Sequence, residues 1–243
     1  MAVRSFDVER ERKARLSDRR HIAFFPAMSV LLAVFVFVGF APTYYLRPSG
    51  LPAIPFYRHL HGAALTLWFS LFIVQTGLIA SRRRTVHRRL GIAGAILAAA
   101  ILVLTPLVVL WAVPRLLQTE PIELTTLIVI GDSLALAVFA ALVIAAMGRR
   151  HQPEAHSRLM LFASMAIMAP ALGRASLLLT GAPIPGLMIH MALPLLVVGH
   201  DVLIMRRIHR ATLWGSVAVV GSMLFSIAIA NTETAHAIVR RLG

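Results

Sequence analysis

The chain has 243 residues, of which 58% are hydrophobic and 14% charged, and its mean hydropathy is +0.80. A soluble domain carries about a quarter of its residues as charged side chains, so this composition excludes an ordinary soluble protein and indicates an integral membrane protein. The formal net charge of +14 does not indicate nucleic-acid binding, because the basic residues stand in short clusters between long apolar stretches. Cysteine is absent, which excludes disulfides and thiolate chemistry.

A polar segment, residues 1–22, opens the chain and lacks the apolar region of a cleavable signal peptide. Apolar stretches follow, each near the roughly 20 residues that a helix needs to cross a bilayer. They cover residues 23–42, 57–80, 90–113, 123–147, 158–180, 186–205 and 213–231. We predict an all-α fold, an integral membrane bundle of about seven transmembrane helices over 23–231. A cytoplasmic tail would precede it, and a short periplasmic tail over 232–243 would follow.

The positions of the arginines predict the orientation of the bundle. Arginines crowd the N-terminal segment and the connections 81–89, 148–158 and 206–210, whereas the other connections hold only isolated arginines. Short loops rich in Lys and Arg remain in the cytoplasm. We therefore expect the N-terminus inside and the C-terminus outside, in a bacterial inner membrane.

A histidine lies near the end of each of the three arginine-rich connections, just before the next apolar stretch. The first two share the pattern His-x-Arg-Leu, at His87 and His156, and the third is His209. The pattern is consistent with duplicated helical hairpins or with chance. Basic groups at this boundary are well placed for anionic lipid head groups. We expect the lipid-binding residues to be Arg82, Arg83, Arg84, His87, His156 and Arg207.

Ionisable side chains within the apolar stretches are costly and each needs a reason. Asp132 and Arg174 are either an ion pair that ties two helices together or groups that line a transport path. His200 and Asp201 lie near the inner end of their stretch.

Two histidines share a depth near the outer face. His61 lies on one helical face with Leu65, Trp68, Phe72 and Gln75, and His190 lies on one face with Pro194 and Asp201, so both histidines are expected to point inward. Imidazole is the commonest metal ligand. We predict a haem or a divalent metal held by His61 and His190, with Arg174 at a haem propionate. For a bare metal the ligand set is His59, His61, Asp132 and His190, and His200 with Asp201 is the fallback site.

Established catalytic motifs are missing, so the sequence does not decide whether the protein is an enzyme. A retinal protein is excluded because the only lysine, Lys13, lies in the polar segment. The last apolar stretch holds no histidine, unlike zinc-dependent membrane hydrolases of the ceramidase and adiponectin-receptor type. Cytochromes of the b561 kind place two ligands on one helix thirteen or fourteen residues apart, but position 75 is glutamine here.

One extended motif runs from His59-Leu-His61-Gly through Thr66, Trp68 and Gln75-Thr76 to His87-Arg-Arg-Leu-Gly91. Together with Asp132, His156-Ser-Arg-Leu-Met160, Pro170, Arg174 and Asp201, it resembles a group of bacterial multi-pass membrane proteins with no assigned activity. The resemblance covers about residues 22–215 and implies about seven helices in a bacterial inner membrane. Two functions therefore stay open: membrane redox chemistry at a metal or haem, or a non-catalytic component such as a small transporter or assembly partner.

Overall fold

A computed structural model describes residues 22–50 and 53–243, so the predicted N-terminal tail lies almost wholly outside the described residues. These residues form helices and no strands. The first helix, Ile22–Tyr45, ends in a π-helical turn, η1 (Ala41–Tyr45). The other helices are α2 (Phe56–Ala80), α3 (Arg84–Thr119), α4 (Ile122–Gly148), α5 (Pro153–Ala166), α6 (Ala169–Thr180), α7 (Ile184–His200) with the π-helical turn η2 (Asp201–Met205), α8 (Arg210–Ala230) and α9 (Glu233–Arg240).

The predicted all-α membrane bundle is confirmed. Six of the described helices are long and apolar enough to cross a membrane, and α5 with α6 makes a seventh span if the bent pair is counted as one. The sequence predicted one continuous helix over 158–180, but this segment bends by 54° between α5 and α6. Pro170, in the first turn of α6, supplies the reason, since proline has no N–H to donate to the carbonyl four residues earlier.

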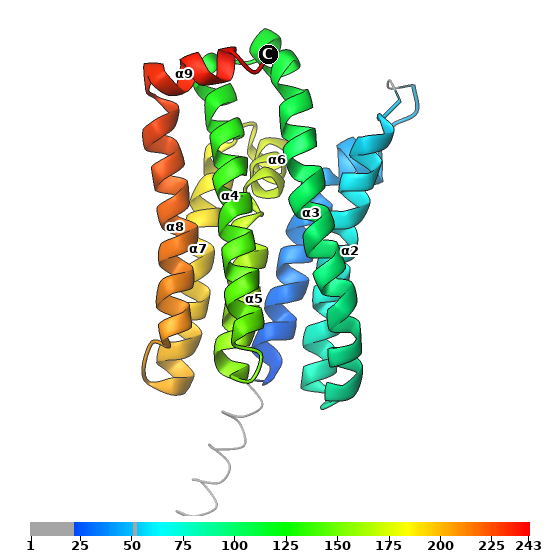
Figure 1. Cartoon of the computed structure of the whole chain (residues 1–243), viewed down its shortest axis with the longest axis vertical. Helices are drawn as coiled ribbons and strands as arrows, with labels where there is room; N and C mark the ends of the chain where they lie inside the picture. The colour runs from blue at the N-terminus through cyan, green and yellow to red at the C-terminus, as the bar shows by residue number, and fades with distance from the viewer. Residues whose placement is uncertain (1–21, 51–52) are drawn as a thin grey trace, which may run out of the picture.

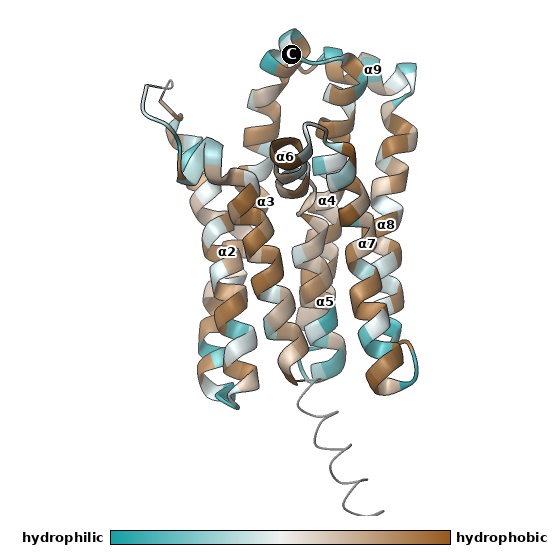
Figure 2. Cartoon of the chain, turned by 180° about the vertical axis from the view of Figure 1, so that it is seen from behind, coloured by the Kyte–Doolittle hydropathy of each residue, from teal (hydrophilic) through white to brown (hydrophobic). Residues whose placement is uncertain are grey.

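The long helices run side by side, and α4 packs against α3, α5, α8 and α9 (Figure 1). The connections α2–α3, α4–α5 and η2–α8 lie at the same end as the start of the first helix. We call this the arginine-rich end, and Figure 2 shows hydrophilic residues gathered there. The predicted short tail 232–243 proves to be mostly helical: α9 lies across the opposite end, where Val239 packs with Val113 and Val129.

The middle of the bundle is packed around Trp68. Its ring meets Phe139 of α4 edge-on at 5.0 Å between centroids, and its Nε1 donates to Ser164 Oγ of α5 at 3.2 Å. Trp68 and Phe72 are 3% and 7% exposed, so the face of α2 expected to point inward does so. Lipid tails are as apolar as these side chains, so close packing and interhelical hydrogen bonds rather than water exclusion hold such contacts together.

Two glycines bring neighbouring helices against the backbone of α6. A Cβ on Gly39 of the first helix would collide with the carbonyl of Ala171, and a Cβ on Gly186 of α7 would collide with that of Leu172. Small residues allow this close approach in membrane bundles. The short helix α6 is therefore fixed on two sides, in the half of the bundle away from the arginine-rich end (Figure 1).

Candidate functional site

Three ionisable side chains on three helices influence one another electrostatically in the half of the bundle that holds α6. Arg174 projects from α6 and interacts electrostatically with Asp132 of α4 and with His61 of α2. We call these three residues the intramembrane polar site. Two further arginines, Arg58 and Arg115, act on Arg174 electrostatically, so the surroundings of the site are positive overall.

Arg174 has few partners for a charged side chain within a membrane span. Its Cζ lies 4.7 Å from the ring centroid of Phe40, and its Nη1 donates to the Pro170 carbonyl at 3.5 Å, the outer limit of a hydrogen bond. No other hydrogen bond or ion pair joins it to the described residues, and the side chain is exposed. A guanidinium has five N–H donors, so most of these donors have no acceptor within the described part of the chain.

Asp132 is half-buried and similarly unpaired. Within the described part of the chain it makes no hydrogen bond, and no ion pair at or below 4.0 Å joins it to Arg174 or to another cation. Its interaction with Arg174 acts across a gap. The described residues therefore do not contain the direct ion pair between Asp132 and Arg174 that was one interpretation of the sequence.

The two histidines predicted as ligands have different surroundings. His190 is 2% exposed, and its Nε2 donates to the Met165 carbonyl at 2.9 Å, next to the break between α5 and α6. His61 is half-buried, and the positive charge of Arg174 acts on it electrostatically. The Nδ1 atoms of both histidines are buried without a hydrogen-bond partner among the described residues.

A set of metal ligands is not assembled around them. The described residues contain no group of three or more His, Asp or Glu side chains that could hold a metal ion. His59 is exposed, with its ring 5.7 Å from that of Tyr44. Electrostatic interactions thus link Arg174 with His61 and with Asp132, while a metal or haem between His61 and His190 stays a prediction.

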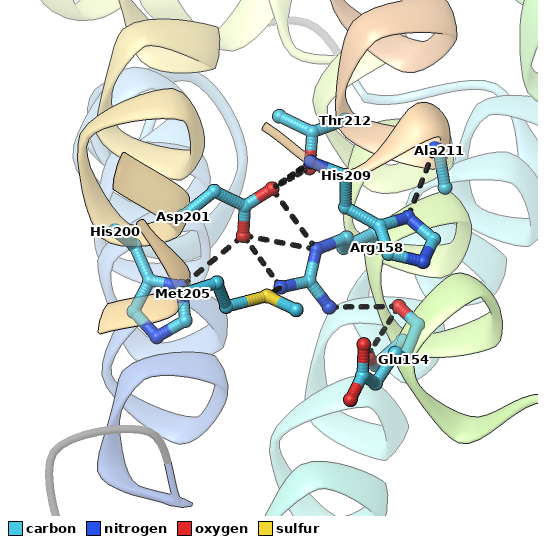
Figure 3. A network of polar contacts seen from close by, with 9 residues as sticks. Glu154, Arg158, His200, Asp201, Met205, His209, Ala211 and Thr212 are labelled. Carbon is cyan, nitrogen blue, oxygen red and sulfur yellow. Dashed lines mark hydrogen bonds and ion pairs between the residues drawn. The ribbon is translucent and has the colours of Figure 1, made fainter. Parts of the chain in front are cut away.

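A second polar cluster lies near the arginine-rich end, centred on Arg158 and Asp201 (Figure 3). Both side chains are 0% exposed. Arg158 Nε lies 3.1 Å from Asp201 Oδ1, and its Nη2 lies 2.5 Å from the same oxygen. The other oxygen, Oδ2, accepts from Thr212 Oγ1 at 2.5 Å and from the backbone N–H of His209 at 3.0 Å. This network joins α5, η2 and the start of α8.

Most donors of Arg158 and both oxygens of Asp201 have partners. Arg158 also donates from Nη1 to the Glu154 carbonyl at 2.9 Å, and its Nη2 lies 2.8 Å from Met205 Sδ. Next to it, the ring of His200 stacks on Phe24 of the first helix at 4.0 Å. With both carboxylate oxygens occupied, the fallback site at His200 and Asp201 lacks a free carboxylate oxygen.

Arg158 was not predicted from the sequence as a member of a buried polar cluster, because it lies at the end of an arginine-rich connection. The available signal was Asp201, a carboxylate at the end of an apolar stretch, which needs a cation when it is buried. The sequence does not say which of many arginines supplies it.

Two of the three histidines of the repeated pattern, His156 and His209, hold helix ends. His156 Nδ1 bonds to the Ala146 carbonyl of α4 at 2.9 Å, and its ring lies 6.3 Å from that of His87. His209 caps α8, since its Nδ1 accepts from the N–H of Ala211 at 3.0 Å. Burial, aided by the positive charge of Arg158, lowers the pKa of His209 and keeps the ring neutral, as an acceptor must be.

Comparison with known proteins found no relative of this chain. No protein-family model matches the chain, and searches of curated proteins and of solved structures found no match either.

Proposed function

We propose that the protein is a small membrane transporter whose path for a polar solute passes through the intramembrane polar site. The observation that carries this proposal is that Arg174 and Asp132, on separate helices, have no ion-pair partner among the described residues. An isolated charge is expensive in hydrocarbon, and such residues face a bundle interior or a water-filled cavity and mark solute pathways. A purely structural role would favour a direct pair, as at Arg158 and Asp201.

The broken span next to the site supports the same function. Helices interrupted within the membrane are tolerated where they are buried in protein or line a cavity, and transporters place binding sites beside them. Here the break between α5 and α6 lies within two helical turns of Arg174, and His190 donates to a carbonyl at that break.

The natural absence of cysteine makes a direct test simple. We expect single variants Asp132→Cys and Arg174→Cys, in membrane vesicles of defined orientation, to react with a charged, membrane-impermeant thiosulfonate. Only an ionised thiol in water reacts rapidly. The controls Val103→Cys and Val217→Cys, whose side chains are 63% and 52% exposed on apolar helix faces, should stay unlabelled because they face lipid.

Protection of the thiols at positions 132 and 174 from the reagent on both sides of the membrane would show that no aqueous path reaches the site and would overturn the transport proposal. Labelling of all four variants alike would show a disrupted bundle, so circular dichroism and gel filtration accompany each variant.

Membrane redox chemistry at a haem or metal between His61 and His190 is the competing proposal. The buried, unpaired Nδ1 atoms of both histidines favour it. The bond from His190 Nε2 to the Met165 carbonyl counts against it, because ligation through that nitrogen would release the carbonyl. An absorbance spectrum and metal analysis of purified protein decide between the two: a stoichiometric chromophore or metal supports the redox function.

We also propose that the arginine-rich end is cytoplasmic, in a bacterial inner membrane, and binds anionic lipids. Two arginines there, Arg82 and Arg206, have positive φ angles of 61° and 55°, a conformation that favours glycine. Arginine at a position that suits glycine supports a role for the charge itself. Together with Arg83, Arg84 and Arg207, these residues would meet phosphate groups of the inner leaflet.

A further inference from the structure

We propose that the intramembrane polar site takes a small zwitterion, with the carboxylate of the solute on Arg174 and its ammonium group on Asp132. This proposal rests on the transport function above and names its solute class. Arg174 offers donors in a planar fork that matches a carboxylate, and Asp132 offers an acceptor without a protein donor among the described residues.

The charges of the site select a zwitterion over simple ions. An anion on Arg174 would leave the Asp132 carboxylate unpaired and would be repelled by it. A cation on Asp132 would leave Arg174 unpaired, beside the further positive charges of Arg58 and Arg115. A solute with both charges pairs each group and adds no net charge to the membrane interior, which is the least costly combination there.

The packing of α6 fixes where the carboxylate end would lie. Gly39 and Gly186 hold the backbone of α6 at Ala171 and Leu172, within one helical turn of Arg174. Phe40 lies under the guanidinium at 4.7 Å. A guanidinium stacked on an aromatic ring keeps its edge N–H groups free, so the fork is held ready for an acceptor in its own plane.

The test is a thermal-shift panel on the full chain in phospholipid nanodiscs. The probes are the twenty common amino acids, followed by matched derivatives of each compound that raises the Tm: the N-acetyl form, which lacks the ammonium, and the methyl ester, which lacks the carboxylate. We expect at least one zwitterion to raise the Tm, and both of its derivatives to lose the effect. Binding of the radiolabelled compound should then weaken on the order of tenfold or more in Arg174→Gln and in Asp132→Asn, and little in the control Arg240→Gln, an exposed position at the end of α9.

No shift with any zwitterion would overturn the proposal, and so would an N-acetyl form or a methyl ester that works as well as its parent, which would make the site one for a simple anion or cation. The wild-type panel decides even if a variant fails to fold. Failure here is separate from failure of the transport function, because thiol labelling at positions 132 and 174 reports an aqueous path whatever the solute.

Discussion

Single residues near the arginine-rich end show how much a buried charge depends on its partner. Arg158 and Asp201 are completely buried and are 43 residues apart in the chain. Removing one member of such a pair leaves an uncompensated charge, whereas removing both can be nearly neutral.

We therefore expect Arg158→Met and Asp201→Leu each to lower the free energy of unfolding by about 3–5 kcal/mol, and the double variant to lose clearly less than the sum. The measurement is denaturation in mixed micelles followed by circular dichroism. Arg207→Met, at an exposed position in the same part of the chain, is the control and should change little. Additive losses in the double variant would mean that the two side chains do not stabilise each other.

The two polar clusters differ in how their carboxylates are paired. Around Asp201 both oxygens have donors, and the cluster explains itself as a link between helices. Around Asp132 no donor is in place within the described residues. Unpaired groups of this kind cost stability, and their retention favours a ligand over a structural role.

At the scale of helices, the position of α6 depends on backbone contacts that only glycine permits. Gly39 and Gly186 face carbonyls of α6, which cannot move aside as a side chain can. Gly173, on α6 itself, has open space around the position of a Cβ.

These differences predict opposite effects of the same substitution. Gly39→Ala and Gly186→Ala should lower the Tm and weaken any binding at Arg174, because α6 must shift to make room. Gly173→Ala should leave binding unchanged and stabilise the helix by up to about 1 kcal/mol, since alanine is the better helix former. Thermal unfolding and the binding measurement above check both. Equal behaviour of the three variants would contradict the tight packing of α6.

For the whole molecule, we propose that the arginine-rich end both sets the orientation and contacts anionic lipid. Each basic residue near an anionic surface contributes on the order of 1 kcal/mol. Arg82 and Arg206 combine this charge with an unfavourable backbone conformation.

Replacing both by glycine separates the two effects. We expect Arg82→Gly with Arg206→Gly to keep or raise the Tm in detergent, since glycine accepts positive φ, while less phosphatidylglycerol and cardiolipin is retained during purification. Native mass spectrometry measures the retained lipid. The double lysine variant, which keeps the charge, is the control and should retain the lipid. Unchanged lipid in the glycine variant would limit these arginines to setting the orientation.

The sequence by itself determined the membrane bundle and most span boundaries. Both follow from properties that act locally: the length and apolarity of a stretch decide whether a helix can cross the bilayer. The predicted span 57–80, for instance, differs from α2 by one residue at its start. The inward face of α2 at Trp68 and Phe72 was predictable too, because its period is that of a helix.

Only the tertiary structure decided which charges are paired. In the sequence, Arg158 looks like the other arginines of its connection. The fold places Asp201 of η2 and Thr212 of α8 in one hydrogen-bonded network with it. Asp132 and Arg174 suggested an ion pair until the packing of α6 held them apart. The folding of α9 across the end of the bundle belongs to the same class. Each depends on contacts between segments far apart in the chain, and the free energy of a buried charge is set by whichever partner those contacts bring within reach.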